Sequence, residues 1–247
     1  MDHHTVAAIS VGGICLDVLG GLYLAYDLLG GQHGPLRLLT RMVTYSLVYG
    51  IGFVLPLGLV FGIAAGAAFG VTVSIELNRM ASGRDHFPLV GEAGFSAIRA
   101  VGFAIGLYAI VGIQFAIVFG ILIAAGQTMA YSRGMRPGLA YAPARRPRLT
   151  RIQLLGAVVR TAGYIATALF CSAVVRHLEH PWSFALRVGL TTGIVTVVGG
   201  AITPFIEYYA EKVPERRLGV IGICVVFCGF VLQSVQYLVV ILDVPVT

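Results

Sequence analysis

The tetrapeptide VFGI occurs twice in this chain, at Val60–Ile63 and again at Val118–Ile121. Each copy lies deep inside a long run without a charged residue, Met42–Ile75 in the first case and Ala100–Ser132 in the second. Apolar runs of about 18 or more residues without charge are typical of transmembrane helices. The two runs therefore predict helices that cross a membrane.

The composition of the whole chain supports the same class. Of its 247 residues, 57% are hydrophobic and only 11% are charged, whereas soluble domains carry about 25% charged residues. This deficit excludes an ordinary soluble domain, which needs a charged surface around its core. We expect an all-α polytopic membrane protein that forms a single membrane domain over residues 1–247.

Each long run is better read as two helices than as one. A single helix over Met42–Ile75 would measure about 50 Å, whereas the hydrocarbon core is about 30 Å thick. A helix can begin upstream at Leu36, and Pro56 with Gly58 supplies a break after which a second helix starts. The run is therefore expected to form a tight helical hairpin.

This hairpin is repeated along the chain. Aligning the two VFGI copies without a gap places Arg41 on Arg99 and the break at Pro56 on Gln114. The opening motif R-M-V-T-Y returns as R-A-V-G-F and, in a third copy, as R-T-A-G-Y at Arg160. The closing motif over 62–76 returns over 193–207, and a polar segment over 176–183 separates the halves of that third copy. The alternative is that glycine-rich apolar sequence aligns with itself by chance.

Three hairpins of like orientation, flanked by one helix at each end, predict eight transmembrane helices. Their expected ranges are 5–29, 36–55, 57–77, 92–113, 115–132, 152–175, 184–206 and 217–242, with the hairpins at 36–77, 92–132 and 152–207. This arrangement puts fifteen of the seventeen arginine and lysine residues on one side of the membrane, whereas a six-helix arrangement divides them about twelve to five. We therefore expect cytoplasmic basic loops, both termini outside, and a bacterial inner-membrane location.

The first helix carries a carboxylate at its centre, Asp17. Its neighbours on that face are small or polar, so Asp17 is expected to face other helices rather than lipid. It is either a proton or cation site or a hydrogen-bonding group that holds helices together. The candidate lining of an ion or substrate path consists of Asp17, Thr191, Thr192, Thr196, Gln233, Gln236 and Tyr237.

Four glycines recur at four-residue spacing: Gly58, Gly62, Gly66 and Gly70. Glycine at this spacing removes side chains from one stripe of a helix and lets backbones approach closely. The stripe is expected to pack within the bundle. The alternative is that the stripe packs against a second copy of the chain or a partner subunit. Copies packed in this way could surround a pore.

The hairpin ends carry opposite charges at matching depth. Arg41 and Glu76 lie at the two ends of the first hairpin, and Arg160 and Glu207 repeat this in the third. The second hairpin keeps its arginine but has Gly134 at the position of the glutamate. We expect structural ion pairs within hairpins, with gating as the alternative.

Two polar segments suggest ligands outside the helices. The loop Arg133–Arg151 is rich in arginine and proline, which favours contact with anionic lipid headgroups, although positive-inside topology alone accounts for it. His177, Glu179 and His180 are weak candidates for a metal site, because their spacing matches no strong signature.

Motifs of known enzymes are absent from the sequence. It contains no G-x-S-x-G, H-E-x-x-H, P-loop or C-x-x-C motif, so we expect neither an enzyme nor a cofactor. The net charge of +6 follows from basic cytoplasmic loops and does not indicate nucleic acid. The function expected is that of a small-solute or ion permease, and the alternative is a non-catalytic structural or assembly subunit of a larger membrane complex.

Overall fold

The computed structural model describes residues 3–28, 36–81, 88–133, 151–174, 181–212 and 215–241. The described residues form helices and short turns and contain no strand, so the all-α prediction is confirmed. Each helix overlaps one of the ranges expected from the sequence. The helices are α1 (His3–Leu28), α2 (Arg37–Leu57), α3 (Leu59–Ala81), α4 (Leu89–Val111), α5 (Ile113–Ser132), α6 (Arg151–Val174), α7 (Pro181–Lys212) and α8 (Glu215–Ile241).

Six of these helices, α2 to α7, contain stretches long and apolar enough to cross a membrane. In α1 and α8 the corresponding apolar stretches are shorter, Ile9–Ala25 and Gly219–Val235. These lengths and compositions identify a multi-pass membrane protein.

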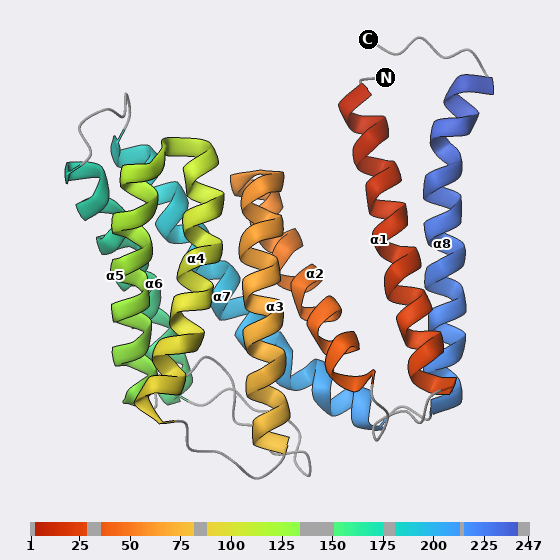
Figure 1. The fold of residues 1–247 in the computed structure, drawn as a ribbon, viewed down its shortest axis with the longest axis horizontal. Helices are drawn as coiled ribbons and strands as arrows, with labels where there is room; N and C mark the ends of the chain where they lie inside the picture. The colour runs from red at the N-terminus through yellow and green to blue at the C-terminus, as the bar shows by residue number, and fades with distance from the viewer. Residues whose placement is uncertain are drawn as a thin grey trace. The chain divides into compact units, whose positions relative to one another are not determined.

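The chain divides into two compact units. Unit 1 joins the two ends of the sequence, residues 1–40 and 212–247, and unit 2 comprises residues 41–211. In unit 1, α1 and α8 lie antiparallel and side by side (Figure 1). They approach so closely that a Cβ atom on Gly13 would lie 2.7 Å from the carbonyl oxygen of Gly229, and one on Gly20 would lie 2.6 Å from that of Gly222.

Unit 2 is a ring of consecutive helices in which α7 returns to α2. Each helix contacts the next, and α7 crosses the unit obliquely to reach the beginning of α2 (Figure 1). One contact from each interface is Gly66 with Gly50, Gly102 with Ala64, Gly120 with Ala100, Gln127 with Tyr164, Thr161 with Gly193, and Tyr45 with Glu207.

Glycines make the two tight turns of this ring. Gly58 separates α2 from α3 with φ of 91°, and Gly112 separates α4 from α5 with φ of 86°, a region that glycine enters without steric cost. Pro56 remains inside α2 and Gln114 inside α5. Of the predicted break at Pro56 with Gly58, the turn therefore lies at Gly58, and the second turn lies at Gly112 and not at Gln114.

Aromatic side chains fill the middle of the ring. Phe103 is completely buried, and its ring centroid lies 5.6–6.4 Å from those of five neighbours. The neighbours are Phe53, Phe61, Phe69, Phe119 and Tyr164, which come from α2, α3, α5 and α6. Around Phe103, unit 2 therefore has a packed aromatic core.

Candidate functional site

Buried ion pairs join described residues of unit 2, toward the end where α2 begins and α7 finishes. Arg41 of α2 binds Glu207 of α7, and Arg99 Nη2 of α4 lies 2.7 Å from Glu76 Oε1 of α3. Arg99 and Glu76 are only 2% and 3% exposed. We call these four residues the charge network.

The pairs join neighbouring hairpins, which corrects the expected pairing of Arg41 with Glu76 inside the first hairpin. The seam between α2 and α3 is formed by another face of α2, where Ser46 and Gly50 contact the α3 glycines. Arg41 and Tyr45 share a different face at i, i+4 spacing and meet α7. The i, i+4 spacing of the motif R-x-x-x-Y indicates that its arginine and tyrosine lie on one face of α2. It does not indicate that Glu207 of α7 is their partner.

Hydrogen bonds and aromatic rings complete the charge network. The hydroxyl of Tyr45 donates to Glu207 Oε1 at 2.8 Å, and Arg99 Nε donates to the Thr72 hydroxyl at 2.8 Å. The Arg99 guanidinium also lies 5.3 Å from the ring centroids of Phe69 and Tyr131, within the range of cation–π attraction. Such compensation is what a buried charge requires to be tolerated.

A small cavity adjoins this network inside the ring. It has a volume of about 10 Å³, which is close to the minimum that holds one water molecule. Its lining includes Glu76, Arg99, Gly200 and Thr203, and so comes in part from α7. The Arg99–Glu76 pair thus borders a space about the size of one water molecule, to which α7 contributes Gly200 and Thr203.

A proline interrupts α7 beside this cavity. Pro204 lies inside the helix, three residues before Glu207. Because proline has no backbone N–H, the carbonyl of Gly200 cannot accept the usual helical bond from residue 204, and helices bend at such positions. Pro204 lies within the closing motif of the third hairpin, but that motif alone did not indicate its place beside the cavity.

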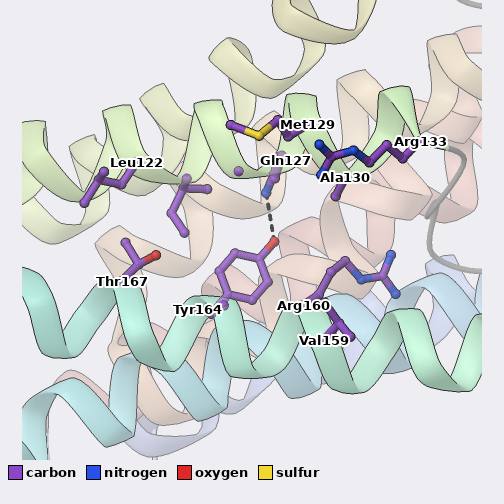
Figure 2. Close-up of a pocket in the computed structure, with 12 residues that line it drawn as sticks. Leu122, Gln127, Met129, Ala130, Arg133, Val159, Arg160, Tyr164 and Thr167 are labelled. Atoms are coloured by element: carbon purple, nitrogen blue, oxygen red, sulfur yellow. Dashed lines mark hydrogen bonds between the residues drawn. The ribbon is translucent and has the colours of Figure 1, made fainter.

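Arg160 occupies the corresponding position at the interface of α5 and α6. It is 9% exposed and lines a pocket together with Arg133, Gln127 and Tyr164 (Figure 2). Gln127 Nε2 donates to the Tyr164 hydroxyl at 2.8 Å. The Glu207 carboxylate expected beside Arg160 binds Arg41 and Tyr45.

Asp17 and Gln233 come together in unit 1. Gln233 Nε2 donates to Asp17 Oδ2 across the α1–α8 seam, and Asp17 also lies against Gly229. The other carboxylate oxygen, Oδ1, is buried and has no hydrogen-bond partner. Tyr237 is 62% exposed, and the side chain of Gln236 lies outside the described part of the chain.

The three candidate threonines belong to unit 2. Thr192 and Thr196 are buried, and Thr191 is half-buried. The Thr196 hydroxyl donates to backbone oxygens of its own helix, at 2.7 Å to Thr192 and 3.0 Å to Gly193. Such local bonds satisfy the hydroxyl without a ligand.

Three of the four glycines of the predicted stripe face α2. A Cβ on Gly66 would lie 2.6 Å from the Cα of Gly50, and one on Gly70 would lie 2.6 Å from the carbonyl oxygen of Met42. A Cβ on Gly62 would meet Val54. Gly58 differs, because it lies in the turn before α3.

Other predicted ligand sites lie outside the described residues. This applies to His177, Glu179 and His180 and to most of the basic loop, residues 134–150. Within the described ranges, no group of three or more His, Cys, Asp or Glu side chains is placed to hold a metal ion.

The helices and the charge network define a multi-pass α-helical membrane protein with ion pairs buried inside a six-helix unit. Comparison with models of protein families, with curated proteins and with solved structures finds no match. The function is therefore inferred from the chemistry of the site.

Proposed function

We propose that the protein is a small-solute or ion permease of a bacterial inner membrane, and that the charge network is its gate. The observation that carries the proposal is Pro204, which weakens α7 one turn before Glu207. A helix weakened there can move the Glu207 carboxylate away from Arg41 while the preceding part of α7 stays packed.

The energy of buried charges favours a role beyond packing. A charged side chain at the centre of a membrane helix costs about 2.5–3.5 kcal/mol on insertion scales, and such residues commonly mark ion or substrate pathways. Apolar residues of similar volume often stabilise a protein as well as a buried ion pair does. Arg99 and Glu76, which are almost fully buried, therefore favour a functional interpretation of the charge network.

The aromatic core fits a closed state of such a permease. Phe103 and its neighbours fill the ring, so a solute could pass only when helices separate. Repeated helical elements that move against one another around a central site are a common plan among secondary transporters. The recurrence of an arginine followed four residues later by an aromatic residue, in α2, α4 and α6, supports this plan.

The distribution of positive charge supports one orientation. The charge network lies toward the end of unit 2 at which α3, α5 and α7 finish, and most arginine and lysine residues flank that end in the sequence. Under the positive-inside rule this end is cytoplasmic. The proposed gate then closes the cytoplasmic side, and the termini are outside.

The gate is tested by removing one carboxylate. Glu207→Gln keeps the size of the side chain but abolishes its charge, so Arg41 loses its ionic partner. Breaking a buried pair costs about 3–5 kcal/mol, and we expect proton or cation leak into proteoliposomes, followed with an entrapped pH-sensitive dye, to rise at least about tenfold.

Two matched variants separate gating from general damage. Exchange of the charges in the double variant Arg41→Glu with Glu207→Arg should restore closure. Asp17→Asn, in unit 1, should leave the leak at the wild-type value. A folded Glu207→Gln protein as impermeable as the wild type would reject the gate.

The alternative function is that of a non-catalytic assembly subunit, which would pack against partner subunits or further copies of the chain. The close packing of α1 against α8 favours this alternative. There the Asp17 carboxylate accepts a hydrogen bond from Gln233, and such bonds commonly hold membrane helices together. An assembly subunit should remain impermeable both as wild type and as Glu207→Gln.

A further inference from the structure

We propose that the pocket between α5 and α6 binds a neutral amphiphile, a hydrocarbon chain that ends in a hydroxyl group. The pocket has a volume of about 270 Å³. Figure 2 shows the hydrogen bond between Gln127 and Tyr164, which joins the two helices across it. Leu122 and Thr167 lie toward the end away from Arg133 (Figure 2). The hydroxyl group of the ligand is assigned to the hydrogen bond, and its chain to the end near Leu122.

Gln127 lines the pocket with a buried amide that lacks one of its partners. The side chain is 4% exposed, and its Nε2 donates to the Tyr164 hydroxyl at 2.8 Å. Its Oε1 atom is buried and has no hydrogen-bond partner among the described residues. A buried acceptor left in this way costs free energy, which a bound hydrogen-bond donor recovers.

Tyr164 supplies the complementary group. Its hydroxyl accepts the hydrogen bond from Gln127, and its own proton can be donated to a further acceptor. A hydroxyl on a ligand both accepts and donates. One such group can therefore accept the Tyr164 proton and donate its own proton to the Gln127 oxygen.

The surroundings of this hydrogen bond favour a ligand without charge. Arg160 also lines the pocket, but it has interaction partners within the protein, so its charge does not require an anion. Arg133 is exposed at the end of α5, where water can solvate it. Gln127 and Tyr164 lie within the stretches of α5 and α6 that are long and apolar enough to cross a membrane. A charged headgroup would lose its hydration at that depth, whereas a hydroxyl with hydrogen-bond partners is tolerated.

The remaining lining is apolar and opens to the outside of unit 2. Met129 and Val159 are 56% and 50% exposed, and in a membrane such a surface faces acyl chains. The volume is below the range of about 300–1,000 Å³ that is typical of sites enclosing a whole ligand. The pocket therefore suits a hydroxyl group and the first part of a chain whose remainder lies in the bilayer.

Two glycines keep this space open. Gly126 and Gly163 both line the pocket, and a Cβ on either would meet no atom within 4 Å. A leucine at Gly163 can therefore fill the pocket without striking the backbone. This provides a test that leaves the buried polar groups in place.

The experiment titrates three compounds with the same chain into the protein in phosphatidylcholine nanodiscs: oleyl alcohol, methyl oleyl ether and oleate. The midpoint of thermal unfolding gives an apparent affinity, and native mass spectrometry counts the molecules retained. We expect oleyl alcohol to stabilise the wild type. The ether has no O–H to donate to Gln127 and should bind about tenfold more weakly, through loss of one buried hydrogen bond. Oleate should also bind more weakly than the alcohol, because its carboxylate is charged.

Two variants locate the effect, and a third is the matched control. Gly163→Leu should lose both the stabilisation and the retained alcohol. Gln127→Leu removes the acceptor, so the alcohol and the ether should bind it equally. Gly94→Leu in α4 changes an exposed glycine that has no atom within 4 Å of an added Cβ and no part in the pocket, and it should respond as the wild type does.

Three results would overturn the proposal. Equal stabilisation of the wild type by alcohol and ether, or a difference that persists in Gln127→Leu, would mean that the hydroxyl is not recognised there. Tighter binding of oleate than of the alcohol would reject a neutral ligand. An unchanged effect of the alcohol in Gly163→Leu would reject the site. None of these results bears on the proposed gate, which lies at other helix interfaces.

Discussion

Arg99 is the largest of the fully buried side chains in the described residues. Its charge is balanced by Glu76, its Nε is bonded to Thr72, and two aromatic rings cover its guanidinium. Each contact comes from an uncharged or oppositely charged group, which is the condition for keeping a cation in an apolar unit. Its guanidinium is therefore held by groups from α3 and α5 at once.

Asp17 permits a prediction at the same scale. Because Gln233 donates to its carboxylate, Asp17→Asn can keep an acceptor at this position, and we expect thermal stability to change by less than about 1 kcal/mol. Asp17→Leu leaves the Gln233 amide without its partner and should cost about 1–3 kcal/mol. Thermal unfolding in detergent measures both. An Asn variant that folds normally but loses ion-coupled flux would instead make Asp17 a coupling site.

Among the elements, the hairpin of α2 and α3 shows most clearly how sequence determines packing. Small residues on both helices bring their backbones together, and Gly58 supplies the turn. Charge-free runs, recurring motifs and the distribution of charge predicted ranges that each overlap one of the eight described helices, and six of these helices are long and apolar enough to cross a membrane. Of the predicted break at Pro56 with Gly58, the turn falls at Gly58, because proline at the last turn of a helix is compatible with helical structure. The second turn falls at Gly112, two residues before the expected Gln114.

The α2–α3 seam gives a prediction for Gly66. In Gly66→Ala the new Cβ would lie 2.6 Å from the Cα of Gly50 and 2.7 Å from the carbonyl oxygen of Ser46. Backbone atoms cannot yield as a flexible side chain does, so we expect a loss of about 1–3 kcal/mol in the free energy of unfolding. The control Gly94→Ala should be neutral or stabilising, since alanine favours helix over glycine. Equal midpoints of thermal unfolding for the two variants would show that the seam tolerates added volume.

For the whole molecule, closure of the ring is what the sequence did not reveal. Three consecutive hairpins can form an open row or a closed ring. The hydrophobic and glycine patterns of the sequence are the same in both arrangements. The Arg41–Glu207 contact exists only because α7 returns to α2, so the expected pairing within hairpins was wrong for Arg41. The packing of α1 against α8 likewise joins segments from opposite ends of the sequence, which local patterns do not predict.

Membrane topology provides the prediction at this largest scale. Fifteen of the seventeen arginine and lysine residues fall on one side of an eight-helix arrangement, and α6, a helix of 24 residues, separates position 138 from Ser183. Such a helix is about 36 Å long, enough to cross the hydrocarbon core.

The test places single cysteines at Gly138 and at Ser183 in a background without Cys15, Cys171, Cys224 and Cys228. In intact cells a membrane-impermeant maleimide should label the cysteine at 183 directly and the one at 138 only after the inner membrane is permeabilised, because basic segments stay in the cytoplasm. Labelling of both from the same side would mean that α6 does not span the membrane. The reverse pattern would keep the span but invert the protein, and would place the charge network at the outer end of unit 2.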